Sequence, residues 1–252
     1  LFKIGKKKST GALSKLGWAF GYLGGLASLF LILILLKFSN ENFKIFNFSV
    51  FLLICPFVGI WSMVFGLSLF KEMKEVQFKS PNMFELIKNI RSAGISNFLI
   101  SYFFFNNAVV SIFAFASMIA AFVFGLSESE ILFLGVLINS FGIVGCLIIG
   151  NFEDKIGSIE AVKICIIGLL IITLILFFTK NYCIFWILAL LIGFFIGPIQ
   201  ASSRSYLTKK IKSTNQMAAF SLYSMFGNLC SVLGPFLVGL VIELTESIRF
   251  GI

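Results

Sequence analysis

Long apolar stretches alternate with short polar connections along the whole chain. A helix that crosses the hydrocarbon core of a bilayer needs about 18 or more apolar residues. Seven stretches reach that length: residues 16–38, 48–70, 96–124, 131–150, 161–179, 182–200 and 217–244. Inside lipid the backbone has to satisfy its own hydrogen bonds, which a helix does within one segment. The pattern therefore predicts an all-α, polytopic membrane helix bundle.

The longest hydrophilic connection, residues 71–94, separates two of these spans from the other five. Within it, residues 80–90 begin with Ser-Pro and continue with apolar residues at helical spacing. This pattern is typical of an amphipathic helix that lies along the membrane surface. A solvated linker is the alternative interpretation.

The basic residues predict the orientation of the spans. Sixteen of the 20 Lys and Arg lie at connections on one side of the predicted membrane, and four lie on the other. Cytoplasmic loops carry an excess of Lys and Arg. We therefore expect the N-terminus and the connection at 71–94 to lie in the cytoplasm.

Composition excludes several classes of protein. Hydrophobic residues make up 59% of the chain and charged residues 12%, against about 25% charged residues in a soluble domain. The sequence has no His, the residue that most often ligates metals or transfers protons near pH 7. We therefore expect no enzyme, no metal and no cofactor.

The remaining charge and the cysteines do not change this interpretation. The net charge of +9 comes from the basic connections, so a nucleic-acid partner is not expected. The five Cys lie in or beside apolar stretches and form no Cys-x-x-Cys pair. They are expected to be buried small side chains.

Uncharged polar residues occur at helical spacing inside the spans. Asn107 and Ser111 are four residues apart in the third span, and Ser224 and Asn228 belong to a polar stripe in the seventh. Such groups avoid lipid, so they either bind a neighbouring helix or line a watery cavity. Both interpretations stay open. The substrate-lining candidates are Asn107, Ser111, Asn139, Gln200, Ser224 and Asn228.

Small residues and prolines form a second pattern. Glycines at intervals of four let helix backbones approach closely, and a proline frees a backbone carbonyl and kinks a helix. The residues expected to serve helix packing are Gly17, Gly21, Gly25, Gly193, Gly197, Pro198 and Pro235.

Several motifs resemble known transporters. Gly150-x-x-x-Asp154-Lys155-x-Gly157 resembles the loop signature of the major facilitator superfamily. Residues 197–205, 220–227 and 233–235, with 16–25, are similar to the vacuole effluxer branch, bacterial relatives of autophagy-linked vacuolar amino-acid exporters. The branch usually has Asp-Gly where Asn107-Ala108 stands.

The resemblance implies a domain organisation. Residues 1–70 would be the last two helices of an N-terminal six-helix bundle, and residues 71–94 a cytoplasmic connector. Residues 95–252 would be the C-terminal bundle, truncated before its last helix. On this basis we expect the chain to be a fragment that corresponds to helices five to eleven of twelve.

Charged residues at the inner ends of two spans suggest a gate. Glu153 and Asp154 close the fourth span and Arg204 closes the sixth, at the same membrane depth. An ion pair there could form when the inner side closes and break when it opens. Alternatively, Arg204 anchors its helix among lipid phosphates and Asp154 caps the next helix.

The functional expectation is a secondary active transporter that works by alternating access. The substrate would be a small polar metabolite; the resemblance implies amino-acid efflux. The expected partners are this substrate, the lipid bilayer and a coupling proton or ion, for a monomer in a bacterial inner membrane. The alternatives are a transport-dead membrane receptor or scaffold and an integral-membrane lipid-modifying enzyme.

Overall fold

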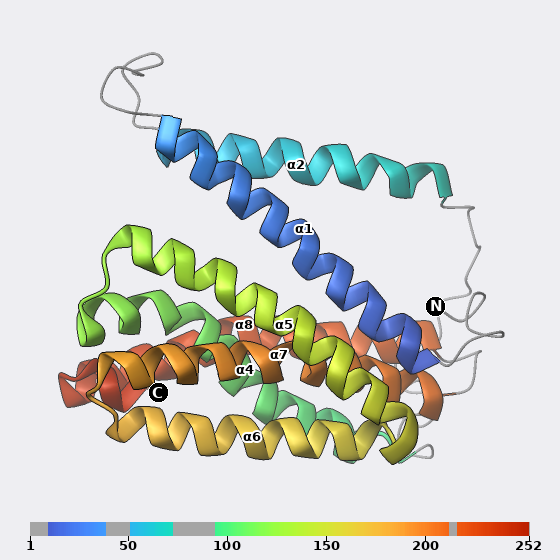
Figure 1. Cartoon of the computed structure of the whole chain (residues 1–252). Helices are drawn as coiled ribbons and strands as arrows, with labels where there is room; N and C mark the ends of the chain where they lie inside the picture. Colours follow the sequence, from blue (N-terminus) through green and yellow to red (C-terminus); the bar gives the residue numbers. More distant parts are fainter. Residues whose placement is uncertain (1–9, 39–50, 73–93, 212–215, 252) are drawn as a thin grey trace. The chain divides into compact units, whose positions relative to one another are not determined.

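The structure, a computed structural model, describes residues 10–38, 51–72, 94–211 and 216–251. Within these ranges the helices are α1 (Thr10–Phe38), α2 (Phe51–Glu72), α4 (Ser96–Phe124), α5 (Glu128–Ile156), α6 (Ser158–Phe178), α7 (Tyr182–Lys210), α8 (Gln216–Thr245) and the 3-10 helix η3 (Ile248–Gly251). Each α-helix overlaps one predicted span, and α1, α5 and α7 extend beyond theirs (Figure 1). The described residues contain no strand, so the all-α fold class is confirmed. The amphipathic helix predicted at 80–90 lies outside the described residues.

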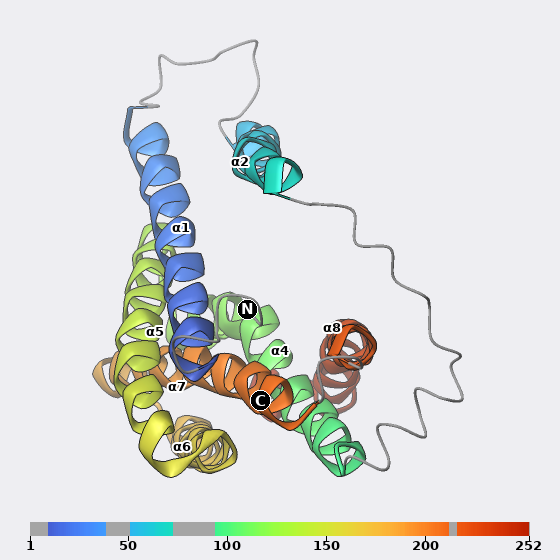
Figure 2. The same ribbon diagram turned by 90° about the vertical axis from the view of Figure 1, so that its right-hand side faces the viewer.

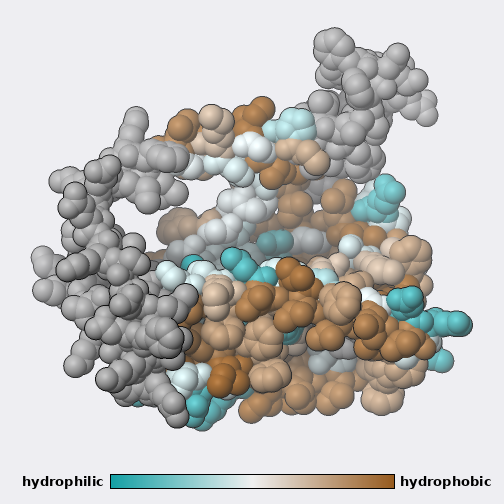
Figure 3. Space-filling model, turned by 180° about the vertical axis from the view of Figure 1, so that it is seen from behind, coloured by the Kyte–Doolittle hydropathy of each residue, from teal (hydrophilic) through white to brown (hydrophobic). Residues whose placement is uncertain are grey.

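The described helices have the length and surface of membrane spans. Six of them are long and apolar enough to cross a bilayer, and the described part of α2 adds a shorter apolar stretch, Cys55–Leu67. Large apolar side chains are exposed on several helices, among them Phe104, Phe122 and Phe178. Apolar residues cover much of the bundle surface in Figure 3. Such a surface suits lipid as the surrounding solvent.

Local capping signals fix where the helices end. Gly125 follows α4 with φ of 68°, and its N–H bonds to the carbonyls of Ala120 and Ala121. Ser127 then starts α5 with a capping box, because its side chain accepts from the Glu130 N–H while Glu130 accepts from the Ser127 N–H. Each device satisfies backbone groups that a helix end leaves unpaired.

The largest compact unit comprises residues 1–22 and 81–252. In it α5, α6 and α7 lie side by side, and α4 pairs with α8 (Figures 1 and 2). Residues 23–80 form a second unit, in which Trp61 of α2 packs between Phe57 and Phe65. This grouping differs from a division at the hydrophilic connection 71–94, which stays a prediction.

Glycine allows α5 and α7 to pack closely. A Cβ on Gly145 would lie 1.9 Å from the Phe194 carbonyl oxygen, and one on Gly193 would lie 2.6 Å from the Ile138 carbonyl oxygen. A Cβ on Gly197 would also meet α5, at 2.8 Å from the Cys146 Sγ. Any side chain at these positions would force the two backbones apart.

The other residues expected to serve packing have different surroundings. Pro198 is buried inside α7, and Pro235 lies inside α8. A Cβ on Gly17 or Gly21 would meet no atom within 4 Å among the described residues. For these two glycines, and for Gly25, a packing role stays a prediction.

Candidate functional site

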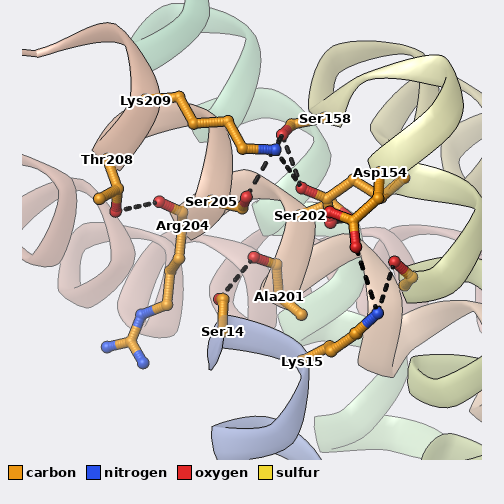
Figure 4. Close-up of polar contacts among 12 residues, drawn as sticks. Ser14, Lys15, Asp154, Ser158, Ala201, Ser202, Arg204, Ser205, Thr208 and Lys209 are labelled. Carbon is orange, nitrogen blue, oxygen red and sulfur yellow. Dashed lines mark hydrogen bonds and ion pairs between the residues drawn. The ribbon is translucent and has the colours of Figure 1, made fainter. Parts of the chain in front are cut away.

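A buried carboxylate joins three helices at the inner ends of the spans. Glu153 of α5 is 1% exposed. It accepts hydrogen bonds from Ser158 of α6 at 2.6 Å, from Ser202 of α7 at 2.9 Å and from Lys209 of α7 at 3.2 Å. Lys209 also donates to Ser158 at 2.8 Å, and the Ser158 and Ser205 hydroxyls are 3.3 Å apart. We call these five residues the buried carboxylate cluster (Figure 4).

This cluster fixes helices of one bundle to one another. A charge without solvent is stable only when ion pairs and hydrogen bonds replace its hydration. Glu153 receives a charged donor and two hydroxyl donors. The cluster therefore holds the inner ends of α5, α6 and α7 together.

A buried lysine connects α1 to the same end of α5. Lys15 is 7% exposed. Its Nζ donates to the Gly150 carbonyl at 3.0 Å and to the Asn151 Oδ1 at 2.8 Å, and lies 3.6 Å from the Asp154 Oδ2. A Cβ on Gly150 would lie 2.4 Å from the Lys15 Cδ. We call this the Lys15 contact; it requires a glycine where the lysine stem crosses α5.

Two more residues of α1 contact α7. The Ser14 hydroxyl donates to the Ala201 carbonyl at 2.8 Å. One turn further along α1, the Trp18 ring faces Arg204, whose guanidinium carbon is 5.9 Å from the ring centroid. The first turns of α1 therefore lie against both α5 and α7.

The structure brings the predicted gate residues to one region but gives the acids other partners. Within the described residues, Glu153 pairs with Lys209 and Asp154 pairs with Lys15. Figure 4 shows the Arg204 side chain directed away from Asp154. The pairing of Arg204 with Glu153 or Asp154 therefore stays a prediction. Sequence reasoning missed the two lysines, which lie 139 and 56 residues from their acids in the chain.

Two predicted lining residues make contacts between helices. Asn107 of α4 donates to the Cys230 Sγ of α8 at 3.2 Å, and its buried Oδ1 has no hydrogen-bond partner. Gln200 of α7 donates to the Asn106 Oδ1 at 2.8 Å. Asn106 is 3% exposed and was not among the lining candidates. Its position next to Asn107 in the sequence was the feature that could have identified it.

Of the other four lining candidates, Ser111 lies beside Asn107: a Cβ on Gly234 of α8 would be 3.4 Å from the Asn107 Oδ1 and closer still to Ser111. Asn139 donates to the Gly135 carbonyl of its own helix at 2.8 Å. Ser111 lies against α8, where a Cβ on Gly234 would be 2.7 Å from its hydroxyl. Ser224 and Asn228 are exposed on α8. The six candidates therefore do not form one cluster, and their lining role stays a prediction.

An apolar cavity of about 490 Å³ lies among α4, α5, α6 and α7, with Val238 of α8 at its edge. Of the lining candidates, only Ser111 borders it. Thr173 adds a second hydroxyl, which already donates to the Leu169 carbonyl at 2.9 Å. In the described part of the chain, no group of three or more potential metal ligands gathers at this or any other place.

Membrane-length helices, capped at short turns and joined by buried polar groups at one end, define a multi-pass membrane protein. The loop signature that ends at Gly157 places it with the transporters of the major facilitator superfamily. The chain belongs to the family described as "Vacuole effluxer Atg22 like", whose model matches residues 4–252.

Individual relatives agree with this assignment. An uncharacterized MFS-type transporter, YxiO of Bacillus subtilis, is 23% identical over 97% of this chain and 60% of its own length. Autophagy-related protein 22 of Yarrowia lipolytica is 28% identical over 62% of this chain and 28% of its own length. The proton-coupled antiporter flippase LtaA of Staphylococcus saprophyticus is 27% identical over 43% of this chain and 29% of its own length.

The chain spans 60% or less of the length of these three relatives. No solved structure matches it.

Proposed function

We propose that the protein is a secondary active transporter that moves a small polar metabolite, such as an amino acid, out of the cytoplasm by alternating access. The observation that carries the proposal is the Lys15 contact. It is a buried, breakable polar contact between α1 and the inner end of α5.

The two polar clusters have different consequences for movement. The buried carboxylate cluster connects α5, α6 and α7, so these helices would move as one body. The Lys15 contact connects this body to α1, beside the contacts that Ser14 and Trp18 of α1 make with α7. A hydrogen bond to a charged group contributes about 1.5–3 kcal/mol. That is the size of free energy that shifts a protein between two populated conformations, so the contact would serve as an inner gate.

The substrate class is supported by uncharged polar groups and by the family. Asn107, Gln200, Ser224 and Asn228 offer hydrogen bonds without a fixed charge, as a site for a small polar solute would. Asn107 has a buried oxygen without a partner, which is a place for a substrate donor. The family name, vacuole effluxer, supports efflux of metabolites.

The setting of the transporter follows the charge distribution and the relatives. We place the N-terminus and residues 71–94 in the cytoplasm because the basic residues gather on that side. A bacterial inner membrane is the proposed location, with YxiO as the bacterial relative. The name of LtaA supports a proton as the coupling ion. We propose a monomer as the working unit.

The experiment is transport by the purified protein, at its natural length, in liposomes. Labelled amino acids should exchange across the membrane above the level of empty liposomes. Lys15→Met should lower the rate at least tenfold because the inner gate loses its donor. The matched control is Lys163→Met, which removes an exposed pair with Glu160 on α6 and should leave the rate unchanged. Absence of exchange by the parent protein would disprove the transport function, whereas an unchanged rate in Lys15→Met would disprove the gate alone.

A further inference from the structure

Arg204 has a positive charge that the neighbouring acids do not neutralise. Its side chain is exposed. The two acids at the same end of the bundle, Glu153 and Asp154, are paired with Lys209 and Lys15. Within the described residues the guanidinium forms neither a hydrogen bond nor an ion pair, and Figure 4 shows it pointing away from Asp154. Arg204 therefore keeps a fork of N–H donors for another acceptor.

The ring beside Arg204 also has a donor without an acceptor. The guanidinium carbon lies 5.9 Å from the centroid of the Trp18 ring. The Trp18 Nε1 is buried and has no hydrogen-bond partner in the described part of the chain. An indole nitrogen can only donate. Because buried donors are normally paired, this position suits an acceptor that the protein itself does not supply.

A third donor belongs to α8. Tyr223 is 5% exposed, and its buried hydroxyl has no hydrogen-bond partner among the described residues. Its ring stacks on Tyr102 of α4, with centroids 4.0 Å apart. Tyr223 belongs to the same buried apolar cluster as Leu207 of α7, which is three residues from Arg204. The described contacts of Arg204, Trp18 and Tyr223 include no carboxylate, so the three present donors to an acceptor from outside.

We propose that Arg204, Trp18 and Tyr223 form a subsite for the carboxylate group of the transported substrate. A planar guanidinium binds a carboxylate through two parallel hydrogen bonds. An indole N–H adds a donor of fixed direction, and a phenol O–H adds one that rotates about its C–O bond. This inference rests on the proposed transport function and narrows its substrate to small molecules with a free carboxylate. Lipid phosphate offers the same oxyanion chemistry, so the experiment has to separate the two.

Binding can be measured without transport through the fluorescence of Trp18, one of three Trp in these 252 residues. Replacing Trp61, Trp186 and any Trp of the full-length protein outside these 252 residues by Phe leaves Trp18, the ring next to Arg204, as the only indole. The purified full-length protein is titrated in a neutral detergent with an amino acid, with its methyl ester and with the amine that lacks the carboxylate. The readout is the change in Trp18 fluorescence with ligand concentration.

We expect a saturable change with the amino acid and at least a tenfold weaker response to the ester and the amine. Arg204→Gln should weaken amino-acid binding at least tenfold, and Arg204→Lys should restore part of it because the charge returns without the fork. Tyr223→Phe should weaken binding severalfold. The matched control, Lys210→Gln, removes a positive charge from the same helix and should bind as the parent does.

The lipid alternative is tested by adding short-chain anionic phospholipid to the same titration. Equal responses to the acid and its ester, or a response to the phospholipid alone, would overturn the proposal. So would amino-acid binding that Arg204→Gln leaves intact. Carboxylate-dependent binding by a protein that exchanges no substrate in liposomes would keep the subsite and reject only the transport function.

Discussion

The Lys15 contact predicts a disulfide that would lock the inner side of the transporter. A Cβ built on Gly150 lies 3.0 Å from the Cβ of Lys15, and disulfides need about 3.5–4.5 Å between these atoms. The disulfide would therefore form if α1 and α5 moved apart by about half an ångström at these two residues. The pair Lys15→Cys and Gly150→Cys also removes the lysine stem that a side chain at 150 would meet.

The reduced pair already weakens the gate. It loses the donor of the Lys15 contact, where hydrogen bonds to a charged group contribute about 1.5–3 kcal/mol. A change of that size shifts a two-state population by about 10- to 150-fold, at 1.4 kcal/mol for each factor of ten. The reduced protein should therefore open at the inner side more readily than the parent. Oxidation should hold the inner side closed through the disulfide.

The assay uses a protein whose native Cys are replaced and a protease site inserted within residues 71–94. After oxidation and cleavage, a disulfide between residues 15 and 150 keeps the two pieces joined on a denaturing gel. The reduced pair should transport at the lowered rate expected for loss of Lys15. This remaining transport should stop on oxidation and return with dithiothreitol, and each single-Cys protein should be insensitive to both reagents. Formation of the disulfide with an undiminished transport rate would refute the gate. Failure of the disulfide to form would refute the contact itself.

Two further predictions concern packing and substrate lining. Gly145→Ala places a Cβ 1.9 Å from the Phe194 carbonyl oxygen and should lower the free energy of unfolding by about 1–3 kcal/mol, measured as a drop in melting temperature. The control is Gly135→Ala, whose Cβ meets no atom within 4 Å. Equal melting temperatures of the two variants would contradict the close packing of α5 and α7. Ser224 and Asn228 lie on the exposed face of α8. Ser224→Leu and Asn228→Leu should each abolish transport with little change in melting temperature. A lower melting temperature with normal transport would remove the two residues from the substrate-lining set.

The positions of the helices could be predicted from the sequence because the length and polarity of each stretch decide whether it spans the membrane. The span predicted at 96–124 coincides with α4, since glycines lie just beyond both of its ends. The predictions stopped early at the inner ends of α5 and α7, which continue to Ile156 and Lys210. A count of apolar residues stops at the first charged residues, whereas helical hydrogen bonds continue wherever those charges find partners.

The candidate site was predictable only in part. The acids Glu153 and Asp154 could be recognised from their position at the end of a span, but a pattern along one helix contains no information about the facing helix. Lys15 was counted only as a basic residue that orients the membrane, although it is buried and paired with Asp154. Its placement on the face of α1 that meets α5 depends on tertiary packing.

The distance along the chain between Glu153 and Lys209 has a consequence for biosynthesis. α5 leaves the ribosome before α7, so the carboxylate of Glu153 emerges 56 residues ahead of its lysine. Until α7 arrives, that carboxylate lacks the charged donor and one of the hydroxyl donors that replace water around it. The nascent α5 would therefore keep its inner end in water and enter its final position only after α7 has been inserted. Chains halted between these two residues would present an unpaired acid at the membrane surface, a distinguishing mark for the proteases that remove incomplete membrane proteins.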